Sequence, residues 1–208
     1  MTDTNLPPPT AAVFDVGNVL YGWAPEAFLA RHLPEDEARL RFIGEVGLWE
    51  WHDGLDGGRD FAEARDELSG RFPHYAHLIA AWGERFGETI SDPVPGVHAI
   101  VEELDARGVP LFGITNFSAD FWTPFAAREA AFFGRFRDIV VSGREKLLKP
   151  DPAIYHLALQ RFGLAPHEAL FIDDRLINVE GAEAVGMHAH LFTDAEDLRK
   201  RLEAEGLL

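Results

Sequence analysis

Five short apolar runs alternate along the chain with longer segments in which apolar residues recur every three or four positions. Most of these runs are continuously apolar, which is typical of strands that are covered on both faces. Alternation of strands and helices of this kind predicts an α/β fold with a mostly parallel sheet. The predicted strands are residues 11–15, 109–115, 138–142, 169–173 and 187–192.

The segments between the later runs carry the periodicity and end signals of helices. Val97, Ile100, Val101 and Leu104 recur at helical spacing, and a glycine at position 108 marks the end of that helix. Another segment opens on a good N-cap, Asp151, with a proline at the first helical position. We predict helices over residues 96–108, 151–163, 174–186 and about 195–205.

The interval between the first two predicted strands is too long for a simple crossover. About 100 residues separate Asp15 from Thr115, whereas a crossover between parallel strands needs far fewer. We therefore predict a helical cap over residues 21–92 that is inserted after the first strand, with residues 1–20 and 93–208 as the α/β core. Its helical patterns cover residues 25–33, 35–47, 59–68 and 75–87.

Polar residues stand at or just after the carboxyl ends of the first four predicted strands. In open parallel sheets, ligands bind outside these strand ends, at the switch point of the topology. One crevice can therefore collect carboxylates, a hydroxyl, an amide and an ammonium group. The residues in question are Asp15, then Thr115 and Asn116, then Lys146 and Lys149, and last Asp173 and Asp174.

Three carboxylates at one site need either protons or a cation. Two of them about 4 Å apart repel by about 4 kcal/mol at an effective dielectric constant near 20. Oxygen ligands with few protein carboxylates suit Mg²⁺, which keeps several of its waters. A carboxylate that faces a metal-bound anion can also act as a nucleophile.

Composition narrows the classes of partner. The net charge of −16 and a pI near 4.9 disfavour nucleic acid and anionic lipid as partners. A phosphorylated substrate would also be repelled at long range, so its site needs local positive charge from a metal ion and Lys149. Cysteine is absent, which excludes disulfides, thiolate nucleophiles and Cys-based zinc sites.

The N-terminal sequence does not have the pattern of a signal peptide, and no apolar run is long enough to cross a bilayer. We expect a cytoplasmic protein with a disordered leader over residues 1–9.

The ordered set of motifs resembles the four motifs of the haloacid dehalogenase superfamily, with a helical cap between the first two. The four stretches are FDVGNVLY, ITN, KLLKPDPAIY and FIDDRLINVEGAEAVG, and the similarity covers about residues 11–193. The resemblance implies a doubly wound, Rossmann-like parallel sheet with an inserted cap. It also implies that Asp15 is the nucleophile, that Thr115 is the phosphate-binding hydroxyl and that Lys149 is the motif lysine. Asn116 joins this catalytic set with a less defined role.

The fourth motif bears on the reaction, because the superfamily contains both phosphatases and 2-haloacid dehalogenases. The acidic pair Asp173 and Asp174 resembles the Mg²⁺-dependent phosphatase form, with Asp174 as the direct ligand and Asp173 acting through water. The pattern FD-x-GNV with DD-x-x-x-N most resembles a bacterial subgroup that includes α-D-glucose-1-phosphate phosphatase. We predict a Mg²⁺-dependent phosphomonoester hydrolase that acts on a small phosphorylated metabolite, with sugar phosphates as the first class to test. The alternatives are a 2-haloacid dehalogenase and a non-catalytic phosphometabolite-binding homologue.

One position departs from the family pattern. Most phosphatases of the superfamily carry a second aspartate two residues after the nucleophile, which donates a proton to the leaving group and a carbonyl to the metal ion. This chain has Gly17 there, so the carbonyl ligand remains and the acid is absent. General acid catalysis is typically worth about 10²–10⁴-fold. We expect good turnover only where the leaving group needs little protonation, or where a water or a cap residue supplies the proton.

Each assignment has a structural alternative. Asp15 could end a turn, the acidic pair could cap the following helix, Lys149 could be a solvated lysine, and Thr115 could bond to the local backbone. The tryptophans of the cap are interpreted as packing residues. Trp49, Trp51 or His52 could instead line the pocket, but core packing is the favoured reading for all three.

Overall fold

The structure of the chain is a computed structural model, and it describes residues 7–208. Residues 1–6 of the predicted leader lie outside the described part. The remainder of the leader is placed against the core, since Pro9 is buried and the carbonyl of Pro7 lies 2.9 Å from Nε2 of His188. For residues 7–9 the prediction of disorder was therefore wrong.

The core is a five-stranded parallel sheet in the order β5-β4-β1-β6-β7. The central strand β1 pairs with β4 on one side and with β6 on the other, through Ala12 with Leu111 and with Leu170. The first strand of the sequence therefore lies in the middle of the sheet. The strands are β1 Ala11–Phe14, β4 Leu111–Thr115, β5 Asp138–Val141, β6 Ala169–Asp173 and β7 His188–Leu191.

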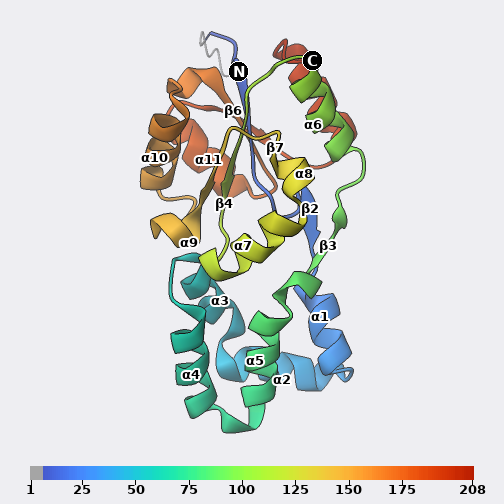
Figure 1. The fold of residues 1–208 in the computed structure, drawn as a ribbon, viewed down its shortest axis with the longest axis vertical. Helices are drawn as coiled ribbons and strands as arrows, with labels where there is room; N and C mark the ends of the chain where they lie inside the picture. The colour runs from blue at the N-terminus through green and yellow to red at the C-terminus, as the bar shows by residue number, and fades with distance from the viewer. Residues whose placement is uncertain (1–6) are drawn as a thin grey trace.

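Helices cover both faces of this sheet (Figure 1). Alternate residues of β1 point to opposite faces, so Ala12 and Phe14 join one apolar cluster while Ala11 and Val13 join the other. The first cluster includes residues of α6 Val97–Ala106 and α12 Ala195–Ala204, and the second those of α10 Pro152–Phe162 and α11 Leu176–Ala184. The predicted doubly wound α/β fold is confirmed.

A helical segment between β1 and β4 stands at the carboxyl end of the sheet (Figure 1). It is framed by a two-stranded antiparallel ribbon, β2 Tyr21–Trp23 and β3 Ile90–Pro93. The helices of this segment lie within residues 25–84, inside the predicted cap. They are α1 Pro25–His32, α2 Asp36–Val46, α3 Leu48–Asp56, α4 Phe61–Arg71 and α5 Ala76–Glu84, with short 3₁₀ turns η1 Pro73–Tyr75 and η2 Phe86–Glu88 beside them.

Some elements were not indicated by the sequence pattern. Helix α3 is short and lies between two glycines, of which Gly47 has a left-handed φ of 63° that separates it from α2. Short segments between glycines resemble loops because glycine is a strong punctuator. Helix α7 Ala119–Arg128 has Pro124 in its interior, and an interior proline argues against a helix. Besides α3 and α7, the elements that the pattern did not indicate include α8 Ala130–Phe133, α9 Ser142–Glu145, η3 Pro166–Glu168 and the β2–β3 ribbon.

Within residues 7–208, no helix is both long and apolar enough to cross a membrane.

Candidate active site

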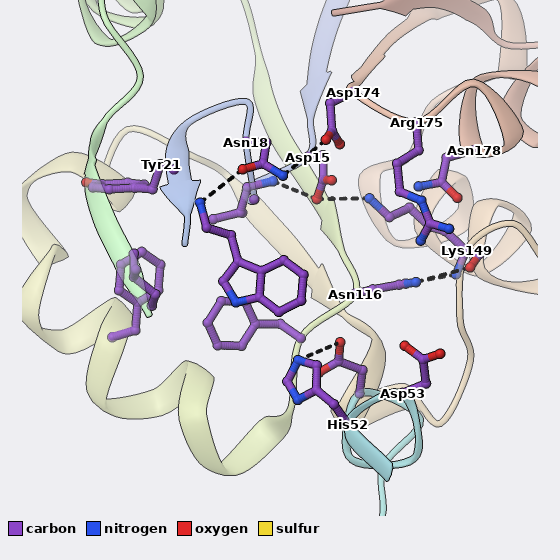
Figure 2. Close-up of a pocket in the computed structure, with 18 of the residues that line it drawn as sticks. Asp15, Asn18, Tyr21, His52, Asp53, Asn116, Lys149, Asp174, Arg175 and Asn178 are labelled. Atoms are coloured by element: carbon purple, nitrogen blue, oxygen red, sulfur yellow. Dashed lines mark hydrogen bonds and ion pairs between the residues drawn. The ribbon is translucent and has the colours of Figure 1, made fainter. Parts of the chain in front are cut away.

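The ends of the three central strands bring the predicted motif residues together. Asp15 follows β1, Asn116 follows β4, and Asp173 is the last residue of β6. Because these strands are parallel neighbours, their carboxyl ends meet at one edge of the sheet. Figure 2 shows Asp15, Asn116, Lys149 and Asp174 around a common cavity at that edge.

Lys149 joins two of these carboxylates. Its Nζ lies 2.9 Å from Oδ1 of Asp15 and 2.6 Å from Oδ2 of Asp173, and its side chain is almost fully buried. The ammonium also lies 5.4 Å from the centre of the Phe171 ring. Burial alone would lower the pKa of Lys149, but the carboxylates of Asp15 and Asp173 outweigh it and raise that pKa above its ordinary value. Lys149 is therefore a buried, charged group, and the solvated alternative is wrong.

The carboxyl group of Asp15 is held in a largely dry environment. Burial raises its pKa to about 7, Lys149 opposes that rise, and Asp173 adds to it. The backbone N–H of Val16 donates to Oδ1 over 2.7 Å, so this oxygen has two partners. Within the described residues, Oδ2 accepts no hydrogen bond and stays available. A divalent cation beside it would favour the ionised form.

Asp173 is fully engaged inside the protein. Besides Lys149, it accepts hydrogen bonds from the side chain of Asn178, at 3.0 and 3.1 Å, and from the backbone N–H of Arg175 at 2.8 Å. The carbonyl of Asn178 in turn accepts a hydrogen bond from the hydroxyl of Tyr155. The sequence motif contained Asn178 without indicating this role. Both carboxylate oxygens of Asp173 are occupied by these hydrogen bonds, and one of them holds Lys149 in place. Asp173 is therefore a poorer direct metal ligand than Asp174.

Asn18 connects the first and fourth motifs. It has a left-handed φ of 56°, a conformation that asparagine tolerates better than most residues. Its Nδ2 donates to Oδ2 of Asp174 over 3.2 Å, and its Oδ1 accepts from the backbone N–H of Trp23. Gly17, directly before it, also lines the cavity. The turn after β1 is therefore joined to Asp174 by a direct hydrogen bond.

The residues present fit a divalent metal ion. Asp15, Asp173 and Asp174 each offer one carboxylate oxygen, and these atoms all lie within 4.8 Å of one another. An oxygen-only donor set of this kind suits Mg²⁺ better than zinc or copper. Because Asp173 is already engaged by hydrogen bonds, the free oxygens favour Asp15 and Asp174, with Gly17 in the same lining.

The remaining predicted residues have different positions. The side chain of Asn116 accepts a hydrogen bond from the backbone N–H of Lys149 over 2.9 Å and donates one to the carbonyl of Lys149 over 3.1 Å. It therefore fixes the loop that carries the lysine. Thr115 is buried at the end of β4 and does not line the cavity; its contact with phosphate stays a prediction. Lys146, the competing lysine, is exposed. Asp151 caps α10 by accepting from the backbone N–H of Ala153, as predicted.

Residues of the cap line part of the cavity, which has a volume of about 230 Å³. His52 of α3 stacks between Trp23 and Phe86, with ring centres 5.5 and 5.6 Å away. Burial lowers its pKa to about 4, so the ring is neutral at neutral pH. The packing interpretation of His52 was incomplete, because this residue both packs and lines the cavity. Trp49 and Trp51 are packing residues, as expected.

Asp56, at the end of α3, is a second cavity residue that the sequence did not single out. Its carboxyl group lies 3.7 Å from Nε2 of His52 and accepts a hydrogen bond from the backbone N–H of Ser118. Burial raises its pKa to about 7, and the charges of Asp53 and Asp15 add to that rise while Lys149 opposes it. No sequence motif marks this residue; only the docking of the cap against the core places it in the cavity.

The raised pKa of Asp56 predicts a pH-dependent loss of stability. From pH 3.8 to about 7 the folded protein holds a proton that the unfolded chain releases, so stability falls as the pH rises through this window. Asp56→Asn removes the buried charge, so we expect it to raise the free energy of unfolding at pH 8 by about 1–3 kcal/mol and by about a third of that at pH 5, where only the first part of the window has been passed. Urea unfolding at both pH values checks this. The control is Glu50→Gln, an exposed position on α3; an equal effect of Asp56→Asn at both pH values would contradict the assignment.

Comparison with known proteins agrees with the motifs. A family model described as haloacid dehalogenase-like hydrolase matches residues 9–186. The sesquiterpene phosphatase AstK of Aspergillus oryzae is 27% identical over 89% of this chain and 90% of its own length. A phosphoserine phosphatase of Thermus thermophilus is 32% identical over 81% of this chain and 66% of its own length. The chain spans only 19% of the mouse acyl-CoA dehydrogenase family member 10, to which it is 27% identical.

Solved structures share the fold at low identity. A HAD family enzyme from Bacteroides thetaiotaomicron has a TM-score of 0.71 and 19% identity, covering 94% of this chain and 98% of its own. The L-2-haloacid dehalogenase of Xanthobacter autotrophicus has a TM-score of 0.63 and 19% identity, covering 94% of this chain and 83% of its own. A dehalogenase shares the architecture of this chain, while the chain's sequence relatives include phosphatases, so the fold alone does not select the reaction.

Proposed function

The chain belongs to the haloacid dehalogenase-like hydrolase family, and we propose that it is a Mg²⁺-dependent phosphomonoesterase with Asp15 as its nucleophile. Its phosphatase relatives make it a hydrolase of the phosphatase type. The observation that carries the proposal is the buried Lys149 ammonium, which Asp173 holds 2.9 Å from Asp15. In our proposal residues 21–92 form the cap, and residues 1–20 and 93–208 form the catalytic core.

The first step forms an aspartyl-phosphate. Oδ2 of Asp15, which is free of hydrogen bonds within the described residues, attacks phosphorus as the bond to the leaving oxygen breaks. Lys149 balances negative charge on the transferring group, and its loop is fixed by Asn116. Water then attacks phosphorus, releasing inorganic phosphate and restoring the Asp15 carboxylate.

Asp15, Asp174 and the carbonyl of Gly17 would hold the Mg²⁺ ion, with Asp173 orienting Lys149 beside them. The ion supplies positive charge to the phosphoryl oxygens. Asn18 steadies this arrangement because it bonds to Asp174 and to the backbone of the β2 strand. The acidic pair and the phosphatase relatives favour this reading over the metal-free 2-haloacid dehalogenase.

The cavity favours a leaving group without negative charge. On the cap side its lining combines aromatic rings with Asp53 and Asp56, whereas the cationic lining residues Lys149 and Arg175 come from the core. An anionic leaving group, such as the carboxylate-bearing part of phosphoserine, would meet like charge there. Hydroxyl-rich groups instead find hydrogen-bond partners in Asn18, His52 and the two carboxyl groups. We therefore place sugar phosphates and polyol phosphates first among the substrates.

Removal of metal is the direct test of the proposed function. We expect hydrolysis of p-nitrophenyl phosphate in Mg²⁺ and a loss of about 10²-fold or more after chelation, because the site then lacks its main positive charge. Restoring Mg²⁺ should restore the rate. Phosphate release that is indifferent to chelator would contradict the proposal. Release of chloride from 2-chloropropionate in chelator would support the dehalogenase instead, and stabilisation by sugar phosphates without any turnover would support the non-catalytic homologue.

A further inference from the structure

The proposed reaction has no proton donor at the position where the family resemblance places one. Gly17 does not have a left-handed φ, and a Cβ built on it would meet no atom within 4 Å. Neither the backbone nor crowding therefore requires glycine there. The acid is missing from a position with room for it, and any proton must come from another group that lines the cavity.

Few cavity residues can supply that proton. Asp15 and Asp174 are committed to nucleophilic attack and metal binding in the proposed function. His52 is neutral at neutral pH because burial lowers its pKa to about 4. Asp53 is exposed to solvent.

Tyr21 donates a hydrogen bond from its hydroxyl to Glu129 over 3.1 Å, and the Lys149 ammonium pairs with two carboxylates. Arg175 also lines the cavity, but a guanidinium does not give up its proton in proteins. Asp56 remains, as a nearly buried carboxyl group whose side chain is 13% exposed.

We propose that Asp56 of the cap protonates the leaving group, in place of the acid that is absent at Gly17. This inference rests on the proposed function. In-line displacement puts the leaving oxygen on the side of phosphorus opposite the attacking oxygen of Asp15. Figure 2 shows His52 and Asp53 of α3 on the far side of the cavity from Asp15 and Lys149. The leaving oxygen therefore faces the helix that carries Asp56.

The end of α3 is held firmly against the core. The hydroxyl of Ser142 donates to the carbonyl of Asp56 over 2.6 Å and accepts from the backbone N–H of Phe117 over 2.9 Å. The backbone N–H of Ser118 donates to the Asp56 carboxyl group. These bonds tie a cap residue to the segment that follows β4, so the carboxyl group has a fixed position relative to the phosphoryl site.

The proton balance of the two steps is complete. As the bond from phosphorus to the leaving oxygen breaks, the Asp56 carboxyl proton moves to that oxygen and an alcohol departs. Asp56 is then a carboxylate, which takes a proton from the water that attacks the aspartyl-phosphate and so returns to its acid form. Burial, with Asp53 and Asp15 adding to it and Lys149 opposing it, raises the pKa of Asp56 to about 7, which keeps a large acid fraction near neutral pH. The neighbouring His52 is neutral there.

Dependence on the leaving group tests the proposal. p-Nitrophenolate leaves without a proton near neutral pH, whereas the alkoxide of glycerol 2-phosphate does not. Asp56→Asn should lower kcat/KM for glycerol 2-phosphate by about 10²–10³-fold and that for p-nitrophenyl phosphate by less than about tenfold. Gly17→Asp in the Asp56→Asn background should restore at least about tenfold on glycerol 2-phosphate. The control Glu50→Gln, on the same helix and outside the cavity, should leave both values unchanged.

Two outcomes would overturn the proposal. One is an equal loss on both substrates in an Asp56→Asn protein whose unfolding shows that it is folded. The other needs no variant: in the unaltered protein, the ratio of kcat/KM for the aryl to the alkyl substrate should rise as the pH passes through about 7, and a constant ratio contradicts an acid at Asp56. If the unaltered protein hydrolyses neither substrate in Mg²⁺, it is the proposed function that fails.

Discussion

Asp15→Asn should abolish turnover while leaving the protein folded. The amide has nearly the same shape, but it cannot form an acyl phosphate, and loss of a nucleophile typically costs about 10⁵-fold or more in kcat. Lys149 keeps its second partner, because Asp173 still lies 2.6 Å from its Nζ. We therefore expect a cooperative unfolding transition close to that of the unaltered protein. Phosphate release from p-nitrophenyl phosphate in Mg²⁺ is the measurement.

The matched control for this variant is Asp151→Asn. Asp151 is an acidic residue close to the site in sequence, but its side chain caps α10 and does not line the cavity. Asparagine is an equally good N-cap, so this change should preserve both stability and rate. Residual activity above about 1% in Asp15→Asn, with contaminating phosphatase excluded by parallel purification, would remove Asp15 from the role of nucleophile.

Lys149→Met should cost both stability and activity. It leaves the buried carboxylates of Asp15 and Asp173 without their shared cation, and breaking a buried ion pair from one side typically costs about 3–5 kcal/mol. Loss of charge stabilisation should also lower kcat by about 10³-fold. The Asp15 carboxyl group, whose pKa burial already raises to about 7, can escape the penalty by taking up a proton, so the loss of stability should be smaller at pH 5 than at pH 8. Urea unfolding without metal at both pH values checks this.

Lys146→Met is the control for the lysine. It removes the same charge three residues earlier, at an exposed position. The free energy of unfolding should therefore change by no more than about 0.5 kcal/mol. A loss of stability in Lys149→Met that matches this control would mean that the ammonium does not hold the two carboxylates in solution. Added Mg²⁺ should recover part of the lost stability in Lys149→Met, because a cation again lies beside Asp15 and Asp174.

Local pattern was sufficient for the elements that carry the motifs. The strand ending before Asp15 and the helix capped by Asp151 were both predicted to within a residue or two, because continuous apolar runs and N-cap signals depend only on neighbouring residues. Helix α7 was not predicted, since Pro124 argues against a helix and only burial of Phe121, Trp122 and Phe125 in the core overrides that preference.

Within the site, the sequence indicated which residue types take part but not how they divide the work. The acidic pair was predicted to serve the metal ion, with Asp174 as the direct ligand and Asp173 acting through water, but the sequence did not show what else would contact them. Hydrogen bonds from Asn178 and Lys149 engage Asp173, while Asp174 meets Asn18. Thr115 matched its motif but does not line the cavity. These roles depend on which oxygen atoms remain free after the chain has packed, and spacing along the chain contains no such information.

The sequence by itself determined the α/β alternation, the insertion after the first strand and the set of polar residues at the strand ends, because periodicity and strand order follow from local side-chain chemistry. Only the tertiary structure decided that Lys149 is buried between two carboxylates and that His52 and Asp56 of α3 face them. The physical reason is that burial and charge pairing are set by contacts between segments distant in sequence, here a cap helix and the ends of strands more than thirty residues away in the chain.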